Sequence, residues 1–124
     1  MPIAIVRYDY ARESSDLFPT TLEEIARELP SIIASALNVS ENPEGKLLPE
    51  DINVRFERSG PLDQNVIDLS VLVLANDYPE RRHNLEERKD ILVQAFSNLV
   101  PDWYTFSIWI LLAPGAYGAS IHRD

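Results

Sequence analysis

Met1-Pro2-Ile3-Ala4-Ile5-Val6 opens the chain, and its apolar run from Ile3 to Val6 has the composition of a β-strand. A helical pattern follows, in which the apolar residues are Leu22, Ile25, Ala26, Leu29, Ile33, Ala36 and Leu37. Beyond it, apolar Ile52, Val54 and Phe56 alternate with polar residues, as in a half-buried strand. The first half of the chain is therefore predicted to be a β-α-β unit.

The limits of this first helix are predicted from local signals. Residues 17–19 have the composition of a loop, and Thr20 with Glu23 has the spacing of a capping box. Pro30 lies inside the helical pattern and is expected to kink or divide the helix. Residues 42–45, Asn-Pro-Glu-Gly, form a predicted turn before the second strand, which Ser59-Gly60-Pro61 ends.

The second half repeats this order. Residues 66–74 are predicted to form a strand, which Asn-Asp-Tyr-Pro at 76–79 breaks. Asn84 and Glu87 resemble an N-cap pair at the start of a helix, and residues 104–112 form a long final strand closed by Pro114-Gly115. The apolar stripe of this second helix consists of Leu85, Leu92, Phe96 and Leu99.

The duplicated β-α-β pattern defines one α+β domain over residues 1–124, with pseudo-repeats at about 2–60 and 65–119. Each helical crossover is expected to return its strand parallel to the first and with right-handed connection. The predicted architecture is therefore a four-stranded sheet with two helices on one face.

The other face of this sheet is expected to be covered by further copies of the chain. Neither the third nor the last strand has a cleanly polar face, so large apolar side chains should lie on the open face whichever way each strand is turned. The two alternating sets are Ile67, Leu69, Val71 and Val73 against Asp68, Ser70, Leu72 and Leu74 in the third strand, and Tyr104, Phe106, Ile108, Ile110 and Leu112 against Thr105, Ser107, Trp109 and Leu111 in the last. Large apolar side chains on an open face usually mark an interface. The alternation thus predicts a homo-oligomer.

Composition excludes several kinds of function. Twenty acidic residues against eleven basic ones give a net charge of −9, which disfavours nucleic acid and anionic membrane surfaces as partners. The chain has no cysteine, no cluster with metal-ligand spacing and no glycine-rich phosphate loop, so neither a metal nor a cofactor is expected. No signal peptide and no apolar run of roughly 18 residues is visible, so a cytoplasmic protein is expected.

Pro2 is the residue with the clearest potential for chemistry. Removal of Met1 would leave the Pro2 nitrogen as a secondary amine at the mouth of a strand. A model α-amino group titrates at about 7.7–8.0, and an apolar site or a nearby arginine would lower that value toward the range where a general base works best. A chain that keeps Met1 would instead have a tertiary amide there, without a basic lone pair.

A Met-Pro start followed by an apolar strand, inside a duplicated β-α-β chain, resembles the tautomerase superfamily over roughly residues 2–119. Arg12 falls where short members of that superfamily have an arginine after the first strand, and residues 48–54 resemble the Pro-Glu-Asp-Val-x-Val start of the second strand. Arg55 lies near the position of a substrate-binding arginine, although the closest register places Asn53 there.

The second half carries further similarity. Residues 81–88 resemble the Arg-Ser-x-Glu-x-Arg start of the second helix in the superfamily. If residues are counted back from Glu86, His83 aligns with the first arginine of this motif. If one residue is inserted, Arg82 aligns with that arginine instead, and Arg81 then matches the first member of an arginine pair. Tyr117, after the last strand, matches a turn that often carries an aromatic residue near the site.

The resemblance implies a homotrimeric tautomerase-type isomerase in which Pro2 is the general base for keto–enol proton transfer on a small carboxylate substrate. The residues it implies for substrate binding are Arg81, Arg82, Arg12, Arg55 and Tyr117. A protonated Pro2 would instead support a decarboxylase, dehalogenase or hydratase acting on a small three-carbon acid. The decarboxylase pattern also requires an aspartate, whose counterpart is Ile52 in one register and Asp51 in the next. The same sequence also fits a non-catalytic trimeric binding protein that retains Met1, or an unrelated ferredoxin-like dimer.

Overall fold

A computed structural model describes residues 2–12, 18–40, 46–64 and 66–114 of the chain. The strands and helices, in chain order, are β1 (Ile3–Tyr8), η1 (Tyr10–Arg12), α1 (Phe18–Leu37), η3 (Pro49–Asp51), β2 (Asn53–Arg58), β3 (Leu69–Asn76), α2 (Pro79–His83), α3 (Leu85–Ser97) and β4 (Phe106–Ala113). Within these residues, no helix combines the length and the apolar character needed to cross a bilayer.

The four strands form one mixed sheet in the order β2-β1-β3-β4. β1 and β2 run parallel, as do β3 and β4, which confirms that each helical crossover returns its strand parallel to the first. The two halves meet at the centre, where β1 and β3 pair antiparallel. The predicted α+β fold with a duplicated β-α-β unit is therefore confirmed.

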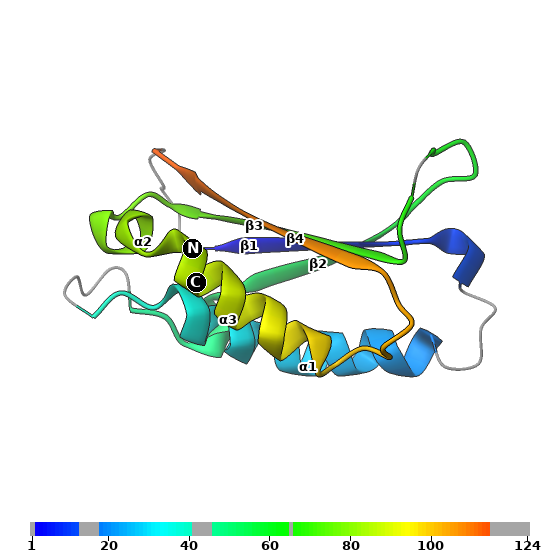
Figure 1. Cartoon of the computed structure of the whole chain (residues 1–124), viewed down its shortest axis with the longest axis horizontal. Helices are drawn as coiled ribbons and strands as arrows, with labels where there is room; N and C mark the ends of the chain where they lie inside the picture. The colour runs from blue at the N-terminus through cyan, green and yellow to red at the C-terminus, as the bar shows by residue number, and fades with distance from the viewer. Residues whose placement is uncertain (1, 13–17, 41–45, 65, 115–124) are drawn as a thin grey trace, which may run out of the picture.

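Helices α1 and α3 cover one face of the sheet, as Figure 1 shows. Burial follows the predicted periodicities, since every second residue of the central strands faces the helices. The side chains with no exposed area that form the centre of this core are Ala4, Val6, Ile25, Leu29, Ile33, Leu69, Val71, Val73, Leu92 and Phe96. Each large one contributes about 1.5–3 kcal/mol through its removal from water, so the core fixes the position of every strand end.

The face of the sheet opposite α1 and α3 is not covered by these helices, and we call it the open face (Figure 1). Strand register places Ile5 beside Leu72 and Leu72 beside Trp109 on this face. Trp109 is 64% exposed and Leu111 is 45% exposed. The predicted exposure of large apolar side chains is therefore confirmed.

The start of α1 differs from the prediction. The helix begins at Phe18, so Pro19 is helical and the predicted loop at residues 17–19 is wrong for the two of these that the structure describes. Thr20 and Glu23 lie inside the helix, and the predicted capping box is therefore wrong as well. Proline suits the first helical turn because its φ is already helical and its missing N–H would have had no partner there.

Pro30 does not divide α1. The helix is continuous from Phe18 to Leu37, and Pro30 lies inside it. Proline removes one backbone hydrogen bond in a helix interior and usually breaks it. Here Leu29 and Ile33 on either side are completely buried against the sheet. Tertiary packing of this face holds the helix through the proline.

Strands β3 and β4 begin two or three residues later than predicted. Thr105 and Asp68 precede the first paired residues, and their side chains accept the hydrogen bonds that strand pairing would otherwise supply. Thr105 N donates to Asp68 Oδ2 at 2.9 Å, and Asp68 N donates to Thr105 Oγ1 at 3.2 Å.

Asn84 occupies the predicted N-cap position of α3, but its side chain makes no capping hydrogen bond. The predicted turn at residues 42–45 lies outside the described residues.

Candidate active site

Pro2 is buried at the start of the central strand β1. Its carbonyl oxygen accepts a hydrogen bond from Asn53 N at 3.1 Å, which ties it to β2. On the other side, β3 pairs antiparallel with β1, and Ile3 lies opposite Leu74. Pro2 is therefore tied to β2 through its carbonyl and lies at the end of the sheet where β1 and β2 begin and β3 and β4 end. We call this the Pro2 end of the sheet.

The segment after β3 supplies the polar side chains of the Pro2 end. Asp77 N donates to Ala113 O at 3.2 Å, which extends the pairing of β3 and β4 by one residue. The short helix α2 follows directly, with Tyr78 as its N-cap residue. In Figure 1, α2 and the start of β1 lie toward the same end of the sheet. The fold thus brings the arginine-rich segment 81–83 to the same end of the sheet as Pro2.

Arg82 is the arginine of this segment that remains accessible. Its side chain is 62% exposed, and its Nε donates to Asp77 Oδ1 at 3.0 Å. A surface ion pair of this kind contributes at most about 1 kcal/mol, so an anion can displace it at small cost. Arg82 can therefore offer its guanidinium to a carboxylate near Pro2.

Arg81, the neighbouring residue, is only 2% exposed. Its Nε donates to Leu37 O at 2.8 Å and its Nη1 donates to Asn76 O at 3.1 Å. Its guanidinium also lies 4.9 Å from the centre of the Tyr78 ring. Burial lowers the pKa of Arg81 from its ordinary value. These contacts are structural, so Arg81 does not have the accessible position expected of a substrate-binding arginine.

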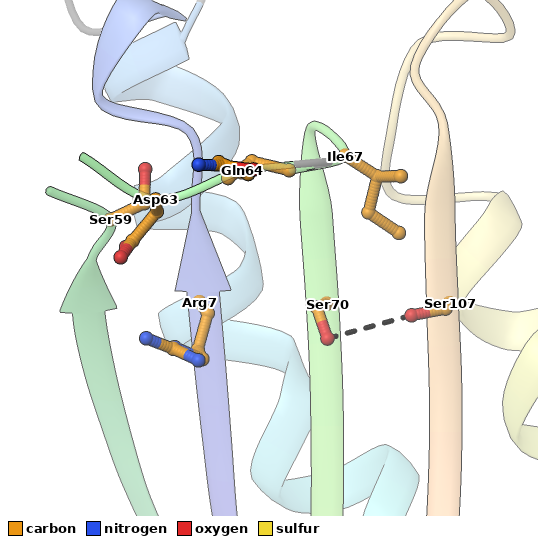
Figure 2. A pocket seen from close by; sticks show the side chains of 8 residues that line it. Arg7, Ser59, Asp63, Gln64, Ile67, Ser70 and Ser107 are labelled. Carbon is orange, nitrogen blue, oxygen red and sulfur yellow. Dashed lines mark hydrogen bonds between the residues drawn. The ribbon is translucent and has the colours of Figure 1, made fainter. Parts of the chain in front are cut away.

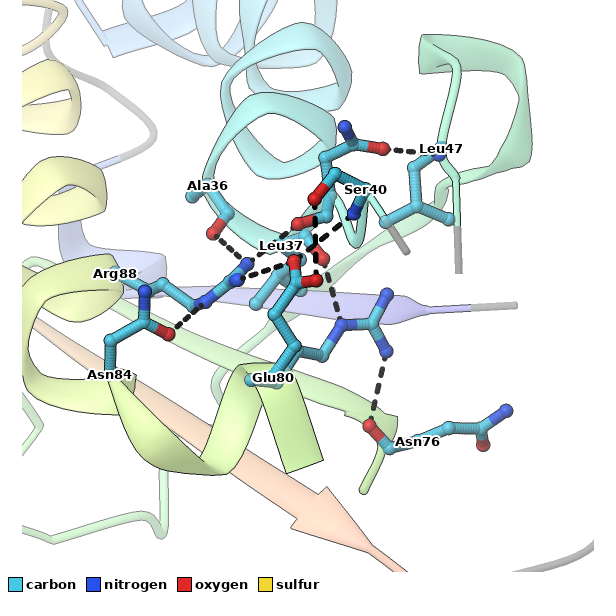
Figure 3. A network of polar contacts seen from close by, with 10 residues as sticks. Ala36, Leu37, Ser40, Leu47, Asn76, Glu80, Asn84 and Arg88 are labelled. Carbon is cyan, nitrogen blue, oxygen red and sulfur yellow. Dashed lines mark hydrogen bonds and ion pairs between the residues drawn. The ribbon is translucent and has the colours of Figure 1, made fainter. Parts of the chain in front are cut away.

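A second buried arginine joins Arg81 at the end of α1 (Figure 3). Arg88 Nη1 donates to Ala36 O at 3.0 Å and to Asn38 O at 2.9 Å. Its Nη2 pairs with Glu80 Oε2 at 3.3 Å, and Glu80 in turn accepts a hydrogen bond from Ser40 N. Two cations thus satisfy the last carbonyl groups of α1, where the helix dipole is negative. We call this network the α1 clamp.

The α1 clamp was not predicted from the sequence, although one signal for it exists. Arg88 lies three residues after Leu85 and four before Leu92, and so falls on the apolar stripe of α3. A charged residue on a buried helical stripe indicates that it is paired or hydrogen-bonded. The clamp joins α1 to the segment that carries Arg82, so it fixes the geometry of the Pro2 end.

Of the other predicted site residues that the structure describes, Arg12 lies far along the chain from Pro2, whereas Arg55 lies closer to it on β2. Arg12 follows β1, so the six residues of that strand, roughly 20 Å in length, separate it from Pro2. Arg55 pairs with Ile5 in register and is exposed, and its Nε donates to Asn53 Oδ1 at 3.4 Å. Tyr117 lies outside the described residues. Arg82 and Arg55 are both exposed on elements that approach the Pro2 end, and substrate binding by either stays a prediction.

Neither candidate for a decarboxylase aspartate lies free beside Pro2. Asp51 closes its own turn, because its Oδ2 accepts a hydrogen bond from Leu48 N at 2.8 Å. Ile52, the counterpart in the other register, is apolar and 8% exposed. Among the residues that the structure describes, no group of three histidine, aspartate or glutamate side chains could hold a metal ion.

Comparison with known proteins gives matches to solved structures alone. No protein-family model and no curated protein matches the chain. A macrophage migration inhibitory factor-like protein from Entamoeba histolytica has a TM-score of 0.58 at 12% identity, covering 98% of this chain and 96% of that one. Malonate semialdehyde decarboxylase has a TM-score of 0.56 at 11% identity, with 96% and 92% covered.

A third structure, 5-carboxymethyl-2-hydroxymuconate delta-isomerase, has a TM-score of 0.52 at 12% identity, covering 98% of this chain and 89% of that one. All three proteins are members of the tautomerase superfamily. Their match over nearly the whole chain shows that it has the fold of that superfamily.

Proposed function

We propose that this chain, which has the tautomerase-superfamily fold, is a tautomerase that uses the amine of Pro2 after removal of Met1. The observation that carries the proposal is the position of Pro2, buried at the start of the central strand with its carbonyl bound to Asn53 N at 3.1 Å. Removal of Met1 would turn the Pro2 nitrogen into a secondary amine, and a neutral amine can accept a proton.

In the proposed reaction, the Pro2 nitrogen removes a proton from the carbon next to a ketone or from an enol hydroxyl, and returns it at another position. Arg82 binds the substrate carboxylate through a bidentate contact, in place of its ion pair with Asp77. Arg12, at the far end of β1, could contact the substrate at Pro2 only from another copy of the chain.

Ketonisation of phenylenolpyruvate tests this proposal. The enol has a carboxylate for Arg82 and a labile proton for Pro2, and its loss can be followed by absorbance. We expect the protein without Met1 to accelerate ketonisation above the rate in buffer. Protein with Met1 retained should show no acceleration, because its Pro2 nitrogen is a tertiary amide. Equal rates for the two forms would contradict the proposal.

The decarboxylase alternative finds less support in the contacts at the Pro2 end. Its required aspartate would be Asp51, whose carboxylate is already bonded to Leu48 N. Asp51→Asn therefore serves as a discriminating variant. A decarboxylase that depended on this carboxylate would lose its activity on a 3-oxo acid, whereas the proposed tautomerase would keep its activity on phenylenolpyruvate.

Arg82→Gln is expected to raise KM for phenylenolpyruvate by about 10- to 100-fold, since a charge-assisted hydrogen bond contributes about 1.5–3 kcal/mol. If Arg82 binds the carboxylate equally in the ground state and the transition state, kcat should change little. Steady-state kinetics measure both constants. Arg27→Gln is the matched control, because Arg27 is exposed on α1. An unchanged KM for Arg82→Gln would remove Arg82 from the site.

We further propose that the chain forms a homotrimer through the apolar part of the open face. Exposed Trp109 and Leu111 beside half-buried Leu72 and Leu74 would then be covered. Trp109→Glu should produce a monomer, because a charge at the centre of an apolar interface is costly to bury. Light scattering after gel filtration measures the mass. Trp103→Glu, which changes a 54% exposed tryptophan outside the sheet, should leave the trimer intact. A parent protein that is monomeric would contradict the proposal.

A further inference from the structure

At the end of the sheet opposite Pro2, the side chains on the open face are polar instead of apolar. Strand register places Glu57 beside Arg7, Arg7 beside Ser70 and Ser70 beside Ser107. These four polar residues form a continuous row across all four strands, and we call it the polar row. The neighbouring row contains Arg55 on β2 but apolar Ile5, Leu72 and Trp109 on the other three strands. An interface between apolar side chains does not need polar residues at these positions. The proposed trimer contact therefore does not explain the polar row.

A cavity of about 410 Å³ lies over the polar row. Its lining residues are Arg7, Ser59, Asp63, Gln64, Val66, Ile67, Ser70 and Ser107. Figure 2 shows Arg7, Ser70 and Ser107 on the strands, with Ser59, Asp63 and Gln64 on the segment that extends beyond them. The volume falls within the range of small-molecule sites, roughly 300–1,000 Å³.

The β2 side of this cavity is held in place by internal hydrogen bonds. Ser59 is 4% exposed, and its Oγ accepts a hydrogen bond from Tyr10 N at 3.0 Å. Gly60 N donates to Asp63 Oδ2 at 2.8 Å, while Asp63 N donates back to Gly60 O at 3.1 Å. These bonds fix the turn that carries Asp63 before any ligand arrives. A preformed site loses less conformational entropy on binding.

The groups in the cavity are suited to a carboxylate at one point and hydroxyl groups at another. Arg7 pairs with Glu57 through Nε at 3.3 Å, and its side chain is 57% exposed. A guanidinium presents further donors in a planar fork that matches a carboxylate. Ser70 Oγ and Ser107 Oγ lie 3.5 Å apart, and they can donate to or accept from a ligand hydroxyl. The Gln64 amide has the same dual capacity.

We propose that this cavity is a second binding site, separate from Pro2, for a small hydroxylated carboxylate. The carboxylate binds Arg7, and the hydroxyl groups bind Ser70, Ser107 and the Asp63 carboxylate. Arg7 lies five positions after Pro2, which corresponds to roughly 17 Å along the strand. A ligand of this size at Arg7 therefore does not reach Pro2.

Titration of the full-length protein with D-glycerate, followed by backbone amide NMR, tests the proposal. We expect shifts of the Arg7, Ser70 and Ser107 amides, with a dissociation constant on the order of 1 mM. Propionate, which has no hydroxyl groups, should bind at least about 10-fold more weakly. Arg7→Gln should weaken glycerate binding by about 10-fold or more, since it removes a charge-assisted contact. Arg27→Gln should have no effect.

Glu57→Gln provides a test of opposite sign. Glu57 competes with the ligand for Arg7, so neutralising Glu57 should tighten glycerate binding severalfold. If the ion pair had only a structural role, Arg7→Gln and Glu57→Gln would weaken glycerate binding equally. Pro2→Ala should bind glycerate unchanged, which separates this site from the proposed catalytic one. Shifts confined to the Pro2 end, or equal binding by Arg7→Gln and the parent protein, would overturn the proposal.

Discussion

Pro2→Ala is expected to lower kcat/KM for phenylenolpyruvate ketonisation by about 10²- to 10⁴-fold, the usual contribution of a positioned general base. Alanine leaves an amine at the N-terminus, but it lacks the ring that fixes the nitrogen relative to the strand. The hydrogen bond from Asn53 N to the carbonyl of residue 2 involves backbone atoms alone, so the variant can keep it. The loss should therefore arise in catalysis and not in folding.

Two controls make this result specific. The thermal unfolding midpoint of Pro2→Ala should match that of the parent protein, since the change removes only two ring carbon atoms. Pro61→Ala alters an exposed proline at the other end of the sheet and should keep full activity. Parent-like activity in Pro2→Ala would contradict the expected loss and would show that the proline ring is not required.

Arg88→Ala is expected to lower the free energy of unfolding by about 3–5 kcal/mol, the usual cost of breaking a buried charged network by removing one partner. Arg88 is 7% exposed, and its loss removes the donors to Ala36 O and Asn38 O. It also leaves Glu80, whose side chain is 28% exposed, without this cation. Urea unfolding, monitored by circular dichroism, measures the change.

Neighbouring Arg81 and Arg82 provide a matched comparison for this second prediction. Arg81→Ala should also destabilise the protein strongly, because Arg81 donates to Leu37 O and Asn76 O in the same clamp. Arg82→Ala should change stability by no more than about 0.5 kcal/mol, as is usual at exposed positions. Equal effects of the two substitutions would mean that the α1 clamp does not stabilise the fold.

Much of the fold could be predicted from the sequence because it depends on local periodicity. Alternation in residues 52–57 and 104–112 gave the edge strands, and helical spacing around Leu29 and Leu92 gave the two long helices. The errors occurred where side chains or packing override local signals. Pro30 is tolerated because the buried face holds its helix, and Asp68 with Thr105 delays the start of two strands.

The candidate site was less predictable because its residues are brought together by tertiary structure. Arg81 and Arg82 are adjacent in sequence and of the same residue type, yet one binds Leu37 O, 44 residues away, and the other is exposed. Their difference depends on where α1 ends. Arg7 could not be connected with Ser70 and Ser107 until the strand order and register were known. Pro2 alone was evident, since its chemistry follows from its position in the chain.

The intact mass of the protein purified from its native host tests the central claim most directly. The proposed mechanism requires the Pro2 nitrogen to be a free amine, so the mass should be lower than that of the full sequence by one methionine residue. A protein that retains Met1 would have the full-length mass and a tertiary amide at Pro2. Such a mass would contradict catalysis by Pro2 and would favour a binding protein with the same fold.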